Sequence, residues 1–322
     1  WAEDAAYRAS DARTQDAPQP PVGVVIATRD RFGLLARALD AVWTQSYPGE
    51  VNVAVVIDGD VPDTLDLPEP PHPDRQTLTV LVNQREAGQC GARNTGMEAL
   101  GEDYLALCDD DDVWTPDRLA LGVAELQAHP EAVAVGGSIR IVRGGSVTLR
   151  RAPYAEVGLD ELLDDRIMEL HSSAMLYRRE PLEKVDGWDA SLPGGYAEDY
   201  DQLLKLARLG PIRLVPEVVA DIEWNGGSYF FSRWRMIADA LTEMLRRYPE
   251  FERAPAGRAR IEAQIAFAHA ALGDRAEAGR WLRAARADNP REPRVLLTRL
   301  VLSRLVSADR LQRALHARGR GI

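Results

Sequence analysis

Residues 104–114 read YLALCDDDDVW, an apolar strand that ends in four consecutive aspartates. Side chains alternate faces along a strand, so Asp109 and Asp111 can point the same way. Adjacent carboxylates repel one another at neutral pH unless a cation lies among them. Mg²⁺ typically takes one or two protein carboxylates and completes its shell with phosphate oxygens and water. The run therefore predicts a Mg²⁺ or Mn²⁺ site at this strand end. The alternative, a turn cap before Pro116, explains Asp112 alone.

Apolar segments on both sides of this stretch alternate with helical ones. Strands are expected at 22–27, 51–57, 78–82, 132–141 and 172–177, and helices at 30–43, 91–100 and 115–129, the last opened by Thr115-Pro116. This alternation predicts an α/β fold with a mostly parallel sheet flanked by helices. In such sheets the ligand crevice lies outside the carboxyl ends of the strands.

Composition narrows the class of protein. The chain has 322 residues, 45% hydrophobic and 28% charged, which is typical of a globular protein. Its formal charge of −11 is a poor match for a nucleic-acid backbone, so no nucleic-acid partner is expected. No apolar run is long enough for a membrane span, and no signal peptide is visible. With only Cys90 and Cys108, in no metal-type spacing, a cytoplasmic location is expected.

Three regions are expected along the chain. Residues 1–20 form an N-terminal arm, 21–225 an α/β domain, and 226–322 an all-helical region rich in Ala, Arg and Leu. Within the last, two helices at 261–272 and 275–287 flank Gly273-Asp274 and resemble one tetratricopeptide-type repeat. Stacked repeats usually need about three units, so we interpret this region as an appendage packed on the α/β domain.

Two further segments combine glycines with charged residues. In 88–96, GQCGARNTG, glycines permit close approach to a ligand, and Arg93 adds a cation suited to phosphate. A plain glycine-rich turn is the alternative. In 194–201, GGYAEDYD, a carboxylate at Glu198 or Asp199 could take a proton from a hydroxyl, unless these acids serve only the helix dipole.

Isolated residues are more ambiguous. Asp58 follows the second strand and could bind a base or ribose, although Asp-Gly is also a common turn. His171 alone is interpreted as structural, and Trp188 as a packing residue beside the site. The aromatic stretch between Trp224 and Trp234 could stack on a sugar, or could pack at the junction of the two parts.

Together, five motifs in this order resemble the inverting glycosyltransferases of family 2, whose nucleotide-sugar-binding fold is called GT-A. The motifs are VGVVIATRDR at 22–31, VVIDGD at 55–60, GQCGARNTG at 88–96, LCDDDDVW at 107–114 and Glu198-Asp199. In the second motif, Ile57 replaces the first Asp of the usual pair and Asp60 replaces the Ser. The resemblance covers residues 22 to 225.

The resemblance implies a role for each matching residue. Nucleotide and donor contacts would come from Thr28, Arg29, Asp58, Arg93, Asp109 and Asp110. Asp111 would hold the metal, and Asp199, with Glu198 beside it, would be the catalytic base. Many members also carry a His after the base helix that helps to hold the metal. Residues 221–228 here read DIEWNGGS, without a His, so Glu223, Asn225 or water is expected in its place.

The resemblance implies transfer of a sugar from a UDP- or dTDP-linked donor to an acceptor hydroxyl, with inversion. The acceptor would be a small molecule, a glycan or a peptide, and a homodimer is conceivable. Two rival functions remain. A nucleotidylyltransferase would place a glycine-rich loop directly after the first strand, where residues 27–30 read ATRD. A peptide- or protein-binding scaffold built on a degenerate transferase would explain the missing His.

Overall fold

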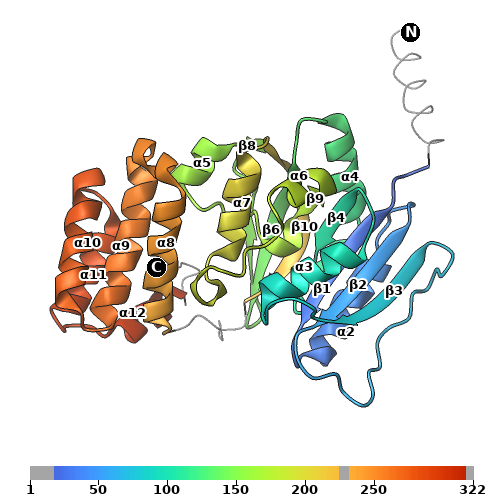
Figure 1. The fold of residues 1–322 in the computed structure, drawn as a ribbon, viewed down its shortest axis with the longest axis horizontal. Helices are drawn as coiled ribbons and strands as arrows, with labels where there is room; N and C mark the ends of the chain where they lie inside the picture. Colours follow the sequence, from blue (N-terminus) through green and yellow to red (C-terminus); the bar gives the residue numbers. More distant parts are fainter. Residues whose placement is uncertain (1–17, 225–231, 317–322) are drawn as a thin grey trace, which may run out of the picture.

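A ten-stranded mixed sheet with helices on both faces forms one part of the molecule, and a bundle of helices forms the other (Figure 1). The structure is a computed structural model that describes residues 18–224 and 232–316. The predicted α/β architecture is confirmed. The N-terminal arm and the aromatic stretch 225–231 fall mainly outside the described residues.

The strands are β1 (Val22–Thr28), β2 (Val51–Ile57), β3 (Gln76–Val82), β4 (Tyr104–Leu107), β5 (Val113–Trp114), β6 (Ala134–Arg143), β7 (Ser146–Arg150), β8 (Glu156–Val157), β9 (Leu176–Arg178) and β10 (Ile212–Glu223). The α-helices are α2 (Phe32–Trp43), α3 (Gln89–Ala99), α4 (Arg118–Ala128), α5 (Leu159–Asp164), α6 (Arg179–Lys184), α7 (Glu198–Ala207), α8 (Trp234–Arg247), α9 (Pro255–Ala271), α10 (Arg275–Asp288), α11 (Pro293–Leu302) and α12 (Ala308–His316). Short 3₁₀ turns are η1 (Ser172–Ala174), η2 (Pro193–Gly195) and η3 (Pro249–Arg253).

The order of strands in the sheet is β3-β2-β1-β4-β9-β6-β10-β5, with β7 paired to β6 and β8 to β10. The first four strands are parallel, as are β6 and β10, while β9 runs antiparallel between β4 and β6. The carboxyl ends of β1, β2 and β4 therefore meet at one edge of the sheet. This edge carries Thr28, Asp58 and the aspartate run.

Burial on both faces explains the apolar runs of the central strands. Val24 of β1 belongs to a core that α2 covers, whereas Val25 belongs to the core on the α3 side. Helix α3 lies very close to β1, because a Cβ built on Gly96 would fall 2.5 Å from Val25 Cγ1. This close packing fixes where α3 begins relative to the end of β1.

The C-terminal helices pack around α9, which contacts α8, α10 and α11 and also reaches α5 of the α/β part (Figure 1). The predicted helix pair on either side of Gly273-Asp274 is confirmed as α9 and α10, and the Asp274 side chain caps α10. No helix in the described ranges is long and apolar enough to cross a membrane.

Two local predictions were wrong. The helix expected to open at Thr115-Pro116 begins at Arg118, because the Thr115 hydroxyl donates instead to the Val218 carbonyl of β10 at 2.8 Å. Residues 172–177 are not one strand, since η1 occupies 172–174 and β9 starts at Leu176. In both places, contacts with distant strands replace the local preference.

Candidate active site

The aspartates that follow β4 face different neighbours. Asp110 turns back to β1, where Thr28 Oγ1 donates a hydrogen bond to its Oδ2 at 2.6 Å. Arg31, directly before α2, forms an ion pair with Asp110 and lies 2.7 Å from Asp111 Oδ2. Burial raises the pKa of Asp110 to about 6, although Thr28 and Arg31 act to lower it. Thr28 and Asp110, both predicted to contact the donor, therefore contact each other.

Arg93 of α3 joins two motifs that are distant in sequence. Its side chain is only 2% exposed, with Nη2 at 2.9 Å from Asp109 Oδ1 and Nη1 at 3.4 Å from Glu198 Oε1. Trp188 packs beside it, with the guanidinium carbon 5.9 Å from the ring centroid, which agrees with its predicted packing role. The charge of Arg93 therefore compensates two carboxylates at the carboxyl edge of the sheet.

Glu198 and Asp199 begin α7, and their surroundings separate their proton affinities. Burial, together with the neighbouring charge of Asp199, raises the pKa of Glu198 to about 7. Burial also acts to raise the pKa of Asp199, but Arg166 and the Tyr200 backbone N–H outweigh it and lower that pKa. Arg166 Nη2 lies 2.5 Å from Asp199 Oδ2. Of the two carboxyls, Asp199 is the one held as an anion, as a base requires.

A second group of side chains offers ligand atoms to a cation. One atom each from Asp109, Asp112 and His171 lies within 4.8 Å of the others. Asp112 is buried, accepts a hydrogen bond from the Ser173 hydroxyl, and has its pKa raised to about 7, chiefly by burial. Carboxylates are ligands for Mg²⁺ and Mn²⁺ and imidazole is a ligand for divalent transition metals, so these residues fit a divalent ion. Asp111, the predicted ligand, lies outside this cluster and faces Arg31.

Asp58 at the end of β2 holds the glycine-rich loop that precedes α3. Its Oδ2 accepts a hydrogen bond from the Gly88 N–H at 2.9 Å, and its Oδ1 accepts one from Asn83 Nδ2 at 2.7 Å. Arg29 is largely exposed and lies 3.8 Å from Asp58. Gly88 has φ +118°, a conformation that favours glycine, and directly precedes the first turn of α3. The strand ends thus set the position of this helix N-terminus.

Glu223, one of the two residues expected in place of the missing metal-binding His, contacts Asp112 through its backbone and Arg37 through its carboxylate. Its backbone N–H donates to Asp112 Oδ1 at 2.9 Å, and its carboxylate lies 3.5 Å from Arg37. Asn225, the other substitute considered, lies outside the described residues.

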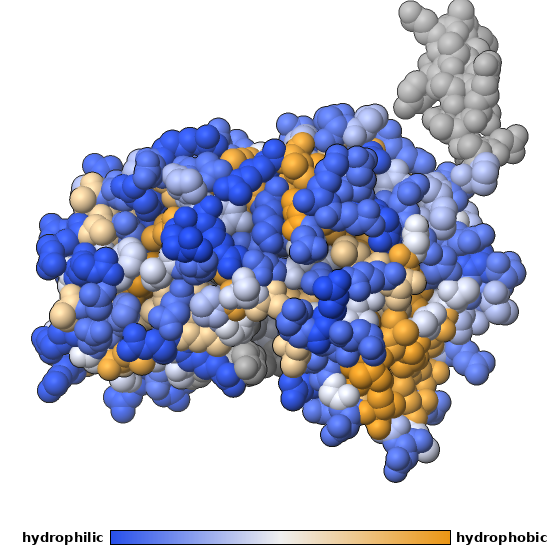
Figure 2. Space-filling view, viewed as in Figure 1, coloured by the Kyte–Doolittle hydropathy of each residue, from blue (hydrophilic) through white to orange (hydrophobic). Residues whose placement is uncertain are grey.

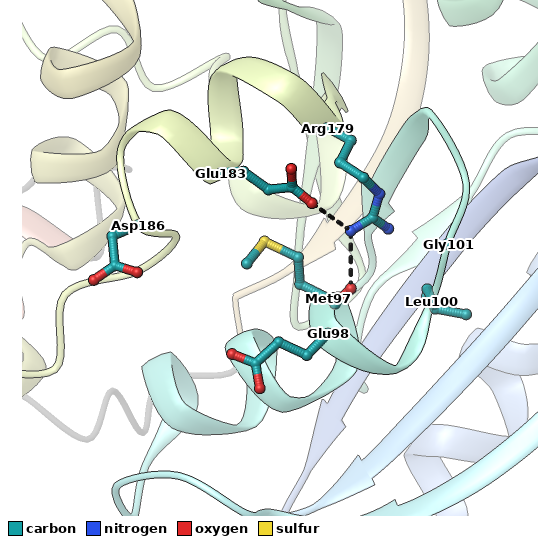
Figure 3. Close-up of a pocket in the computed structure, with 7 residues that line it drawn as sticks. All are labelled: Met97, Glu98, Leu100, Gly101, Arg179, Glu183 and Asp186. Carbon is teal, nitrogen blue, oxygen red and sulfur yellow. Dashed lines mark hydrogen bonds and ion pairs between the residues drawn. The ribbon is translucent and has the colours of Figure 1, made fainter.

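One surface depression lies away from these motifs, between α3 and α6 (Figure 3). It measures about 530 Å³, and Arg179 on one wall donates to the Met97 carbonyl and approaches Glu183. Its lining comprises Met97, Glu98, Leu100, Gly101, Arg179, Glu183 and Asp186. None of the predicted site residues lines this depression, so it is separate from the candidate active site.

Sequence reasoning missed three residues of the assembled site. Arg31 stands within the first quoted motif, but only the fold brings it to Asp110 and Asp111. His171 was interpreted as structural because it stands alone in the sequence, and only the fold brings it to Asp112. Arg166 carries no local signal, since it lies 33 positions before Asp199.

The comparisons with known proteins agree on one family. The family model described as "Glycosyl transferase family 2" matches residues 23–186, just over half of the chain. An uncharacterized glycosyltransferase of a Nostoc species is 28% identical over 171 residues, covering 51% of this chain and 52% of the relative. The succinoglycan biosynthesis protein ExoW of Rhizobium meliloti is 31% identical, covering 48% and 53%. This chain thus spans about half the length of these two curated relatives.

Solved structures share the fold. TarS of S. aureus, residues 1–349 in complex with UDP-GlcNAc, has a TM-score of 0.58 at 18% identity, covering 93% of this chain and 92% of that one. The mannosyltransferase PcManGT of Pyrobaculum calidifontis, in complex with GDP-Man and Mn²⁺, has a TM-score of 0.55 at 20% identity, covering 95% and 89%. With the family match and the GT-A-like sheet in agreement, this chain belongs to glycosyl transferase family 2.

Proposed function

We propose that this chain transfers a sugar from a nucleoside-diphosphate sugar to an acceptor hydroxyl, with inversion at the anomeric carbon and with the help of a divalent ion. The observation that carries the proposal is the contact of buried Arg93 with both Asp109 and Glu198. Arg93 thus connects the aspartate run, which would bind the diphosphate, with Glu198-Asp199, which would bind the acceptor. Both halves of a transfer reaction would therefore lie next to each other.

The donor would lie along the carboxyl edge of β1, β2 and β4. We assign base and ribose recognition to Thr28, Arg29 and Asp58, and the sugar-diphosphate to Asp109, Asp110 and Arg93. The UDP-GlcNAc of TarS and the GDP-Man of PcManGT make a nucleotide sugar the class of ligand to test first. We expect a UDP- or dTDP-linked donor.

A divalent ion would be held by the aspartate run. Asp109, Asp112 and His171 offer converging ligand atoms, and Asp111 would join them after leaving Arg31. When bound, such an ion supplies Lewis-acid stabilisation of the charge that develops on the leaving diphosphate. Arg31 and Arg93 would add fixed positive charge beside the same oxygens.

Asp199 would act as general base. Its carboxylate would accept the proton of the acceptor hydroxyl as the acceptor oxygen bonds to the anomeric carbon and the bond to the diphosphate oxygen breaks. Its lowered pKa keeps it ionised at neutral pH. Glu198, with a pKa of about 7, would remain largely a hydrogen-bonding partner of Arg93.

Residues 21–225 would form the catalytic domain, and 226–322 the helical region that contributes to the acceptor side. The acceptor would be a small molecule, a glycan or a peptide.

A thermal-shift panel tests the proposal. UDP-, dTDP- and GDP-sugars are added with Mn²⁺ or Mg²⁺, because a ligand that binds only the native state raises Tm by mass action. One nucleotide class should raise Tm, and EDTA or Asp111→Ala should abolish the rise. Indifference to every nucleotide would favour the scaffold function. For a binding donor, release of nucleoside diphosphate supports transfer, whereas pyrophosphate would identify a nucleotidylyltransferase.

A further inference from the structure

Helix α9 belongs to the helical region, beyond the part of the chain that the family model matches, yet it presses against the α/β part. A Cβ built on Gly257 would lie 1.7 Å from the Leu163 carbonyl oxygen and 3.0 Å from Asp164 Cα. The two backbones are therefore in direct contact at the end of α5. Asp164 stands two positions before Arg166, so α9 fixes the start of the loop that carries this arginine.

One turn further along α9, Arg260 contacts a residue next to Arg166 and a residue next to Asp199. Its Nε lies 3.6 Å from Oδ1 of Asp165, the residue that precedes Arg166 in the chain. Its Nη2 lies 3.2 Å from the Tyr200 hydroxyl oxygen, and its guanidinium carbon lies 5.6 Å from the Tyr200 ring centroid. Tyr200 directly follows Asp199. The same side chain thus connects the Arg166 loop with the first turn of α7.

Two donors fix the carboxylate of Asp199. Arg166 Nη2 donates to Oδ2 at 2.5 Å, and the Tyr200 backbone N–H donates to Oδ1 at 2.7 Å. An ionised carboxylate has about four acceptor positions, so two remain for a hydroxyl that approaches from the open side. The Asp199 side chain is 22% exposed, which leaves such an approach open.

We propose that the helical region contributes to the transfer site: α9 positions the Asp165–Arg166 loop, and Arg166 in turn orients the carboxylate of Asp199. The proposal rests on the proposed function, because it assumes that Asp199 is the base. Arg166 is then a positioning residue, since it acts through Asp199 and not on the acceptor itself.

The charges around Asp199 give the sign of the expected effect. Arg166 comes from the loop after α5, Arg93 from α3 and His171 from the segment before η1, while Glu198 precedes Asp199 on α7. The Tyr196 phenol also interacts electrostatically with Asp199. Burial opposes ionisation of Asp199, and Arg166 is the strongest influence in its favour. Without Arg166, the pKa of Asp199 should rise, because the carboxylate loses its adjacent positive charge.

The first test measures this pKa directly. The carboxyl carbon of Asp199 is titrated by NMR in the full chain, with its signal assigned through Asp199→Asn. Arg166→Gln should raise the pKa of Asp199, and Arg166→Lys should restore much of the lowering, because a lysine keeps the positive charge. An unchanged pKa in Arg166→Gln would overturn the proposal.

The second test concerns the contribution of α9. Arg260→Gln should shift the Asp199 pKa upward, as Arg166→Gln does but by less, whereas Arg253→Gln should not. Arg253 is a matched control, since it also bridges the helical region to α5, through an exposed ion pair with Asp160 at 2.7 Å. Arg260→Lys provides a milder variant if the Gln variant folds poorly. Equal shifts in the Arg260 and Arg253 variants would overturn the role of α9.

Calorimetry with UDP and Mn²⁺ separates this inference from the proposed function. All the arginine variants should bind UDP as the wild type does, while the acid side of the pH–rate profile for UDP release moves upward in Arg166→Gln and, by less, in Arg260→Gln, and stays in place in Arg253→Gln. If the wild type binds no nucleotide, the proposed function fails, but the titration still decides whether Arg166 controls Asp199. If UDP binds and the rate profile of Arg166→Gln matches the wild type, the inference alone fails.

Discussion

At the scale of single residues, the acidic pair at the start of α7 divides two tasks. Glu198 and Asp199 are adjacent, but Glu198 contacts Arg93 whereas Asp199 contacts Arg166. Arg93 is buried and shares its charge with Asp109, while Arg166 lies closer and serves one carboxylate. Burial and the charge of Asp199 outweigh Arg93 and raise the pKa of Glu198, whereas Arg166 and the Tyr200 backbone N–H outweigh burial and lower the pKa of Asp199. Neighbouring carboxyls with diverging pKa values are a common arrangement in acid–base catalysis.

Replacing Asp199 by Asn should reduce turnover by about 10²–10⁴-fold, because general-base assistance is typically worth that much. Binding of UDP with Mn²⁺ should change little, because Asp199 is assigned to the acceptor hydroxyl and not to the nucleotide. Steady-state release of nucleoside diphosphate, with calorimetry for binding, measures the two quantities. Full turnover in Asp199→Asn would show that another group removes the proton.

Glu198 should make the stability of the fold depend on pH. Its folded pKa of about 7 lies above the ordinary value of 4.5, so the folded chain holds a proton that the unfolded chain has released. Stability from this group is present below about pH 4.5 and is lost as the pH rises to about 7. Glu198→Gln should thus gain stability relative to the wild type between pH 4.5 and pH 8. Urea unfolding of both proteins at these two pH values provides the check, and a constant difference would contradict it.

At the scale of elements, the position of α3 depends on a close contact with β1. A Cβ on Gly96 would lie 2.5 Å from Val25 Cγ1 in the core, so Gly96→Ala should destabilise the fold by about 1–3 kcal/mol, the usual cost of overpacking. Gly101→Ala is a matched control, since nothing lies within 4 Å of its added methyl. Urea unfolding measures both variants. Equal stabilities would mean that α3 can move away from β1 without cost.

At the scale of the whole molecule, the outermost strand on one side of the sheet, β3, is exposed. Among the described strands, β3 pairs with β2 alone, and its Val80 and Val82 are 42% and 43% exposed. Figure 2 shows hydrophobic residues gathered over the region of β2 and β3. An uncharged, apolar edge strand favours pairing with other chains, and charged residues on the edge oppose it.

Val80→Lys should therefore lower the tendency to associate, while the free energy of unfolding changes by no more than about 0.5 kcal/mol, as for an ordinary surface substitution. Light scattering as a function of protein concentration measures the association. Leu296→Lys is a control, because Leu296 is an exposed apolar residue on a helix, 62% exposed. Equal light scattering from Val80→Lys and the wild type would show that β3 does not mediate the association.

The sequence by itself determined the alternation of strands and helices and the edge at which the motifs meet. Buried parallel strands need apolar runs on both faces, and these runs are visible without a structure. Since the carboxyl ends of parallel strands share one edge, Thr28, Asp58 and the aspartate run were correctly expected there. The helix pair around Gly273-Asp274 was equally visible, because the turn has its own local signal.

Only the tertiary structure decided which charge faces which. Asp111 turned to Arg31, whereas His171 joined Asp109 and Asp112, and neither outcome follows from spacing along the chain. The pairing of Arg166 with Asp199 likewise depends on α9 packing against the end of α5. The physical reason is that strand and helix patterns are local, while the energy of a buried charge depends on neighbours that the whole fold brings within a few ångströms.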